Sequence, residues 1–276
     1  MGPPLRHECA HRTARSLDAR RICCPRRSWM RFLILCKTDQ ASYAGDAPHS
    51  GRGAALVRLL ASLREAGVLR LAGELLPASS GARLVFDGRE WSTHPGPFGA
   101  PDELVAAFAL VDVRDRDEAL TWAARWPAAD GQEVEVREAG CSAGCVGFEV
   151  ATGAPQDGRQ RYMVLLKSDH EQELDVHPPP GIIAAMMRHN EEGARAGIVL
   201  AGEGLQPSSK GSRLRFAGGR HSLFDGPFTE TKELVAGFWL IEAASLDAAC
   251  DWARNYPYPR RGRVDVEVRT LAGAQA

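Results

Sequence analysis

The sequence predicts an α+β protein in which two copies of one unit form a pseudo-dimer within a single chain. Two observations support this prediction. The segment Arg31–Asp39 recurs as Arg161–Asp169, and further matches follow at the same offset of 130 residues. Both halves also contain the same order of apolar runs and helical periodicities. A repeat of this length, in one order, indicates two domains of the same fold.

Each copy begins with a short apolar run, residues 31–37 or 161–167, and its length and composition predict a buried strand. A helix follows, ending at Ala66-Gly67 or Ala196-Gly197, because glycine readily adopts the left-handed conformation found at helix ends. The apolar residues at helical spacing are Leu56, Leu59, Leu60 and Leu63 in the first copy, and Ile182, Ile183, Met186 and Met187 in the second.

The remaining elements also occur in pairs. Strands are expected at 68–76, 83–86 and 104–113 in the first copy, and at 198–206, 213–216 and 234–243 in the second, with a short edge strand after Gly88 or Gly219. Asp115 or Ser245 should cap a second helix, which stops before a proline. Alternating valines near residues 134 and 266 predict the last strand of each copy.

The resulting order, β-α-β-β-α-β with one extra edge strand, is a ferredoxin-like arrangement that places both helices on one face of an antiparallel sheet. Its strands also carry apolar residues on the opposite face. We therefore expect the two copies to pack sheet to sheet. The copies should span residues 30–138 and 161–270. Residues 139–160 have linker composition, and 271–276 form a tail.

Residues 1–29 differ from the rest of the chain. They hold seven arginines against Glu8 and Asp18, a net charge of +5, and show no apolar periodicity. A disordered or mis-annotated extension and a transit peptide are the open interpretations. Cysteine and histidine lie too close together here for a structural zinc module, so no metal and no cofactor are predicted.

Composition excludes several classes of protein. A net charge of −1 gives no concentrated basic face for nucleic acid. No apolar run approaches the roughly 18 residues of a membrane span. The seven cysteines lack regular spacing, which argues against a disulfide framework and favours the cytoplasm.

The segments Asp225–Glu233 and Gly237–Glu242, with Ala201–Pro207, resemble the YCII-related family and its DGPFAETKE branch. The resemblance covers residues 161–270 and, more weakly, 31–137. It implies a dimeric α+β barrel, here formed within one chain, with a cleft between the paired units. Some relatives resemble lyases that remove chloride from aromatic rings, and a His-Asp pair has been suggested as catalytic in others.

The resemblance does not supply that pair here, because Leu56 and Met186 occupy the positions where the histidine is expected. His189 lies close to one helical turn further on. It is either a surface or interface histidine or a general base, and its ordinary pKa suits both roles.

Three carboxylates are candidates for the cleft: Asp225, Glu230 and Glu203. They could exchange protons or bind a cation. Alternatively, Asp225 serves only the turn, because Asp-Gly-Pro is a strong turn former. The first copy has Pro95 and Ala100 in place of Asp225 and Glu230, so a functional role for them would place the site in the second copy.

Three hypotheses about function remain open, and the sequence does not decide whether the protein is an enzyme. The first is a small cofactor-independent lyase or isomerase that acts on a cyclic or aromatic metabolite between the repeats. The second is a non-catalytic small-molecule-binding or regulatory partner protein, since members of the branch resemble neighbours of sigma-factor genes. The third is a structural module.

Overall fold

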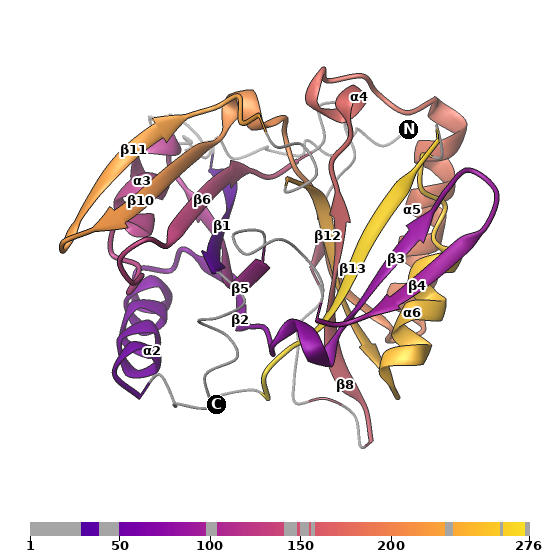
Figure 1. Ribbon diagram of the computed structural model, residues 1–276, viewed down its shortest axis with the longest axis horizontal. Coiled ribbons are helices and arrows are strands. Elements are labelled where there is room, and N and C mark those ends of the chain that lie inside the picture. Colours follow the sequence, from indigo (N-terminus) through magenta and orange to yellow (C-terminus); the bar gives the residue numbers. More distant parts are fainter. Residues whose placement is uncertain are drawn as a thin grey trace, which may run out of the picture.

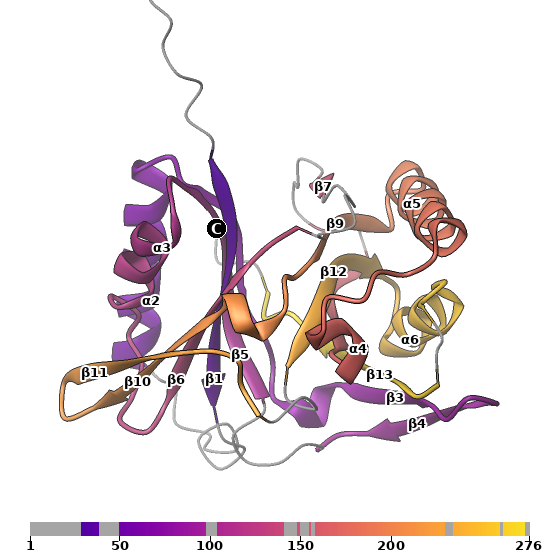
Figure 2. The same cartoon turned by 90° about the horizontal axis from the view of Figure 1, so that it is seen from above.

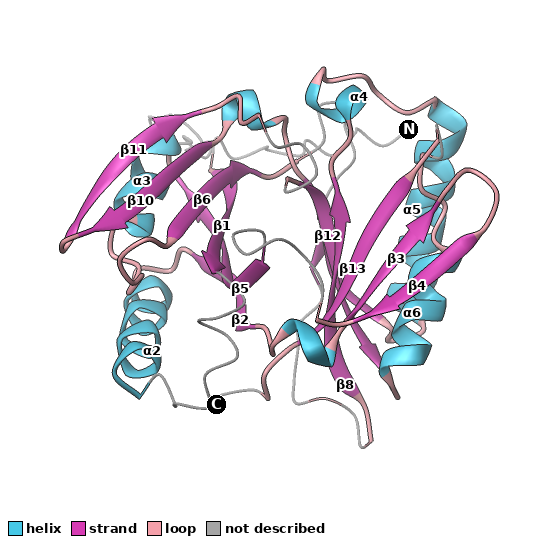
Figure 3. Ribbon diagram, viewed as in Figure 1, coloured by secondary structure: helices cyan, strands magenta, loops and turns pink. Residues whose placement is uncertain are grey.

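The computed structural model describes residues 29–38, 50–97, 104–140, 148–149, 155, 158–229, 234–259 and 262–273. Two antiparallel sheets face each other, and helices cover the outer face of each (Figures 1 and 3). Seen from above, the layers run helix, sheet, sheet, helix (Figure 2). The predicted α+β fold of two repeated domains packed sheet to sheet is confirmed.

The outer layers consist of two helices on each side. α2 (Ser50–Glu65) and α3 (Arg116–Ala123) pack on the first sheet. α5 (Pro180–Arg195) and α6 (Leu246–Asn255) pack on the second. None of the described helices has the length and hydropathy needed to cross a membrane.

The first sheet has the strand order β11-β10-β6-β1-β5-β2. Four of its strands come from the first copy: β1 (Met30–Thr38), β2 (Leu69–Glu74), β5 (Leu104–Val113) and β6 (Glu133–Glu138). Its other two strands come from the second copy: β10 (Ser212–Ala217) and β11 (Arg220–Asp225).

The second sheet mirrors this arrangement in the order β4-β3-β13-β8-β12-β9-β7. Its strands from the second copy are β8 (Gln160–Lys167), β9 (Val199–Gly204), β12 (Val235–Ala243) and β13 (Val264–Thr270). The first copy supplies β3 (Ala82–Phe86) and β4 (Trp91–Pro95), and β7 (Phe148–Glu149) lies within the predicted linker.

The two copies therefore exchange hairpins, a feature that the order of elements in the sequence does not predict. β10 pairs with β6, placing Leu214 opposite Val134. β3 pairs with β13, placing Leu84 opposite Val266. Each sheet is completed by a hairpin from the other half of the chain (Figure 1).

Local sequence signals account for the ends of the second helix in each copy. The side chain of Asp115 accepts a hydrogen bond from the Glu118 amide, and that of Ser245 accepts one from the Ala248 amide. Both predicted caps are confirmed. The short helices α4 (His170–Glu173), η1 (Ala78–Ser80) and η2 (Ser208–Lys210) were not predicted from the sequence.

The sheets bury a shared apolar layer between them. Leu33 and Leu35 of β1 belong to the same cluster as Met163 and Leu165 of β8. At its centre, the rings of Phe108 and Phe238 are 6.4 Å apart. Burying one such side chain contributes about 1.5–3 kcal/mol, so this layer holds the two halves together.

The Gly-Pro-Phe loops are fixed by close packing in both copies. A Cβ atom added to Gly226 would lie 1.9 Å from the carbonyl oxygen of Ser208, and one added to Gly96 would lie 1.7 Å from that of Ala78. Both obstacles are backbone atoms, which cannot rotate away. The glycine of this motif therefore has a steric role in both halves.

Candidate functional site

The inner face of each sheet carries buried charges beside the apolar layer. Side chains alternate along a strand, so Lys37 lies on the same face as Leu33 and Leu35. We call Lys37, Glu135, Arg137 and Arg213 the first charged cluster. Their equivalents Lys167, Glu267, Arg269 and Arg83 form the second charged cluster.

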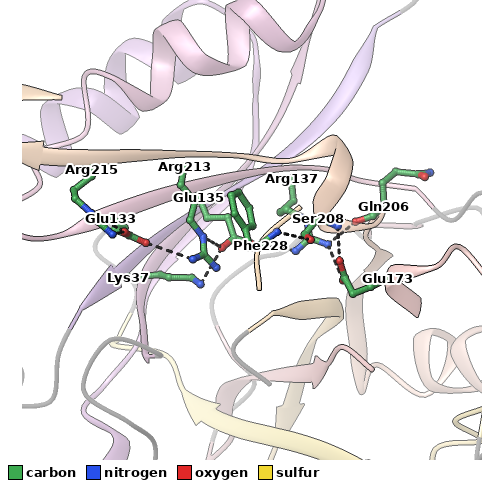
Figure 4. Close-up of polar contacts among 10 residues, drawn as sticks. All are labelled: Lys37, Glu133, Glu135, Arg137, Glu173, Gln206, Ser208, Arg213, Arg215 and Phe228. Atoms are coloured by element: carbon green, nitrogen blue, oxygen red, sulfur yellow. Dashed lines mark hydrogen bonds and ion pairs between the residues drawn. The ribbon is translucent and has the colours of Figure 1, made fainter. Parts of the chain in front are cut away.

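In the first charged cluster, three cations surround one carboxylate (Figure 4). The Nζ atom of Lys37 lies 2.9 Å from Oε2 of Glu135, and Arg213 Nε donates to the same oxygen at 2.9 Å. Arg137 donates to Oε1 at 3.0 Å. Glu135 and Arg137 are fully buried, and Lys37 is 3% exposed.

The second charged cluster repeats this arrangement with the same residue types. Lys167 Nζ lies 3.0 Å from Oε1 of Glu267, and Arg83 donates to that oxygen at 2.7 Å. Arg269 lies 4.0 Å from Oε2. Each cluster takes its lysine, glutamate and one arginine from one copy, and its other arginine from the exchanged hairpin of the other copy.

The charges shift the pKa values of the buried groups. Burial alone would raise the pKa of Glu135, but Lys37, Arg137 and Arg213 together hold it well below its ordinary range. The pKa of Glu267 is lowered against its burial in the same way by Lys167, Arg83 and Arg269.

Lys37 shows the opposite balance. Burial lowers its pKa below the ordinary value of 10.5, Arg213 and Lys167 lower it further, and Glu135 opposes them. Burial and the neighbouring cations therefore outweigh the single carboxylate beside Lys37, whereas Arg213 and Arg137 have second carboxylates in Glu133 at 3.6 Å and Glu173 at 3.9 Å.

The buried arginines also hold the segments that cross between the sheets. Arg137 donates to the carbonyl of Gln206, just before η2, and the Gln206 amide donates to the carbonyl of Glu138. Arg269 donates to the carbonyl of Leu76, just before η1, at 2.9 Å. Among the described residues, neither lysine Nζ donates a well-aligned hydrogen bond. The arginines therefore hold the crossing segments, whereas each lysine is held by its ion pair with a buried glutamate.

Phe228, in the segment that follows β11, lies against the first charged cluster. The guanidinium of Arg213 stacks on the ring of Phe228, 4.0 Å from its centroid. The Phe228 amide donates to the hydroxyl of Ser208, whose own amide donates to Glu173 of α4 at 2.8 Å (Figure 4). Phe228 thus links the loop to the charges between the sheets, whereas Phe98 lies outside the described residues.

Asp225 lies at the exposed end of β11, away from the charged clusters. It forms an ion pair with Arg116 of α3 and accepts a hydrogen bond from Ser212 at 3.2 Å. An open hollow of about 400 Å³ lies beside it, lined by residues of both copies, including Phe32 and Lys210. The equivalent positions in the other half are Leu246, Ala82 and Pro95, which lack these polar groups.

The other predicted site residues lie elsewhere. Glu203 is buried on β9 and accepts a hydrogen bond at 2.6 Å from Arg31 of β1, which joins the two sheets. His189 of α5 packs against the rings of Trp252 and Tyr256 in the helix layer. Burial lowers the pKa of His189, opposed by Glu192. Glu230 lies outside the described residues.

The structure does not bring Asp225, Glu203 and His189 together, because each contacts a different set of side chains. The charged clusters are not among the sites predicted from the sequence. The available signal was the recurrence of charged residues at alternate strand positions in both copies, as in Lys37 and Lys167. Within the described ranges, no group of His, Cys, Asp or Glu side chains is arranged to hold a metal ion.

Comparisons with known proteins agree with the repeat. Residues 30–139 and 161–272 each match the model of a family described as the YCII-related domain. An uncharacterized protein of Rhizobium meliloti (strain 1021) is 39% identical over 90 residues, which are 33% of this chain and 70% of that protein.

A solved heme-binding protein from Thermus thermophilus is a more remote match. The alignment covers 88% of this chain and 90% of that chain, at 13% identity and a TM-score of 0.38. So low a score carries no inference about a ligand of this chain.

Proposed function

The chain belongs to the YCII-related domain family, and on that premise we propose that it binds a small organic anion between its two sheets. One observation carries this proposal. Lys37 and Lys167 are buried on the facing inner surfaces, and each shares its neighbouring carboxylate with arginines. A ligand carboxylate would give each ammonium group a second acceptor beside its glutamate.

The chemistry of the groups supports an organic acid. A lysine ammonium has three donors, and a buried cation is stabilised strongly by a charge-assisted hydrogen bond to a carboxylate. Leu35 and Leu165, two residues before Lys37 and Lys167 on the same strands, belong to the apolar layer between the sheets. It suits the carbon skeleton of a ligand whose acid group faces the cluster.

Binding has better support than catalysis. General acid–base catalysis requires side chains within hydrogen-bond reach of the same reacting atoms. Asp225, Glu203 and His189 contact separate partners on separate elements. A lyase or isomerase reaction that uses these residues and Glu230 therefore remains a prediction. The cytoplasmic location is also still a prediction.

Replacing Lys37 with methionine tests the proposal. Methionine keeps the unbranched shape and most of the length of the side chain but removes its charge, and a hydrogen bond to a charged group contributes about 1.5–3 kcal/mol. We therefore expect calorimetric affinity for the best-binding carboxylate of a screened set to fall by about 10- to 100-fold.

The matched control is Arg263→Met, which removes an exposed cation whose described partner is Asp265. This variant should bind like the original chain. The proposal fails if no carboxylate in the set binds, or if the two variants lose affinity equally.

The pH dependence of binding provides an independent test. Because the pKa of Lys37 is lowered on folding, the unfolded chain binds more protons than the folded chain between that lowered pKa and 10.5. Stability from this group therefore rises with pH in that window. A bound anion favours the charged ammonium and reverses the shift.

Anion binding should accordingly take up a proton, and affinity should fall as pH rises through the window. Calorimetry in buffers of different ionisation enthalpy measures this uptake directly. Proton release, or an identical uptake in Lys37→Met, would contradict the assignment.

A further inference from the structure

The strand β11 forms an exposed edge of the first sheet. It stands at the end of the strand order, and within the described part of the chain it pairs only with β10. All of its residues are exposed, and Leu223 and Phe224 keep 49% and 48% of their accessible surface. The β10–β11 hairpin lies at the outer rim of the molecule (Figures 1 and 2). Such an edge presents unpaired backbone groups and apolar surface to another strand.

β11 lacks the features that protect most edge strands from pairing. It contains neither proline nor lysine, and its register with β10 is unbroken. The equivalent edge strand β4 ends in Pro95, which has no amide hydrogen, and its Thr93 accepts a hydrogen bond from Arg254 of α6. Of the other two edges, β7 has two residues and β2 is largely half-buried. β11 is therefore the edge best suited to accept another strand.

The sequence of β11 is suited to pairing with itself. Opposite residues of antiparallel strands lie on the same face, so two strands related by a twofold axis pair residues whose numbers have an even sum. If the axis passes through Leu223, this residue meets Leu223 of a second chain, and His221 lies opposite Asp225. The same symmetry brings the backbone groups that β11 directs away from β10 against those of the second β11.

The side chains complement each other in this register. Two exposed leucines meet on the axis, and apolar and hydrogen-bonded cross-strand pairs each contribute about 0.2–1 kcal/mol. The described bonds to Asp225, from Arg116 and Ser212, both use Oδ1, so Oδ2 can accept a hydrogen bond from the His221 ring of the second chain. An axis one residue earlier would instead place Leu223 against His221 and leave Asp225 opposite the turn between β10 and β11.

We propose that β11 is a dimerisation strand, which pairs with β11 of a second identical chain about a twofold axis at Leu223 and joins their first sheets into one. The symmetry closes the contact, so assembly stops at two chains. Two short strands bury less surface than most stable interfaces, so the dimer should dissociate on dilution. The inference is independent of the proposed anion binding, whose lysines lie on β1 and β8.

Sedimentation velocity of the full chain over a range of concentrations tests the dimer. The mass should rise with concentration from that of one chain to that of two. Leu223→Lys places two ammonium groups together on the axis and should raise the dissociation constant on the order of tenfold or more, because like charges directly opposite each other are destabilising. Thermal unfolding shows whether this variant is folded.

Charge changes at His221 test the same contact without altering the apolar pair. His221→Asp places two carboxylates opposite each other and should weaken the dimer. His221→Lys places a permanent cation opposite Asp225 and should tighten it, which a loss of folding would not do. The matched control is His94→Lys on the exposed strand β4, which should leave the dissociation constant unchanged.

Cross-linking identifies the register. Opposite residues of antiparallel strands have Cα atoms about 4.5–5.5 Å apart, which a disulfide can span. Under mild oxidation, Leu223→Cys should therefore give a covalent dimer. Ser222→Cys, and His94→Cys on β4, should give no more covalent dimer than the original chain.

Three results would overturn the proposal. A chain that stays monomeric at every concentration would leave the β11 edge to a strand of a different protein. An equal dissociation constant in Leu223→Lys and His94→Lys would place the contact on another surface. A disulfide through Ser222→Cys, with none through Leu223→Cys, would remove the axis from Leu223.

Discussion

Replacing Glu135 with glutamine is expected to lower the free energy of unfolding by about 3–5 kcal/mol, as when one partner of a buried ion pair is removed. The side-chain volume hardly changes, so packing is preserved. The substitution leaves Lys37, Arg137 and Arg213 around a neutral amide in a region from which water is excluded. Urea denaturation of both chains gives the difference directly.

Glu133→Gln is the matched control on the same strand. Glu133 is half-buried, accepts hydrogen bonds from the exposed Arg215 and lies 3.6 Å from Arg213, which keeps its shorter bond to Glu135. Exposed ion pairs contribute about 0–1 kcal/mol, so this variant should lose little stability.

The cause of the loss at Glu135 can be checked separately. Adding Lys37→Met to Glu135→Gln removes one of the uncompensated cations and should restore part of the stability, as a double-mutant cycle would measure. Two outcomes would show that charge does not stabilise the cluster. One is an equal loss of unfolding free energy in Glu135→Gln and Glu133→Gln. The other is no regain of unfolding free energy when Lys37→Met is added to Glu135→Gln.

Much of the fold follows from local patterns. Apolar runs and helical spacing locate β1, β8, α2 and α5, because burial on one face imposes a period that the sequence must satisfy. Asp115 and Ser245 identify the starts of their helices, because unpaired amides in a first turn need an acceptor.

Local sequence patterns cannot predict the exchange of hairpins between the two copies. Arg83–Phe86 and Arg213–Phe216 have nearly the same alternation, so either hairpin satisfies the local requirements of either sheet edge. The exchanged arrangement has long-range hydrogen bonds at the crossing segments, from Arg137 to Gln206 and from Arg269 to Leu76. These bonds exist only once both sheets are in place.

The charged clusters are also difficult to predict from local sequence patterns. Charged residues at alternate positions of a strand, such as Glu135 and Arg137, normally indicate a face in water. Here that face meets the other sheet and is buried. The motif around Asp225 is more conspicuous in the sequence, although Asp225 is exposed, pairs with Arg116 and accepts a hydrogen bond from Ser212. Charge recurring at the same strand positions in both copies is the more informative signal.

The exchange predicts that neither half of the chain forms a folded monomer. Residues 1–146, expressed alone, retain β1, β2, β5 and β6, but their sheet lacks β10 and β11. Their own β3–β4 hairpin lacks its partner strand β13. The inner layer that contains Phe108 would be exposed to water. Residues 147–276 have the reciprocal defects.

We therefore expect each half alone to self-associate or remain unfolded, and the mixed halves to form a one-to-one complex with a single cooperative unfolding transition. Circular dichroism and analytical ultracentrifugation measure both properties. In the matched control, the intact chain carries a protease site between residues 141 and 147 and is cut after folding. It should stay assembled, because the sheets are held by exchanged strands and a shared apolar layer. A monomeric half with its own cooperative transition would mean that its hairpin can close its own sheet. The charged clusters would then no longer require residues from both copies.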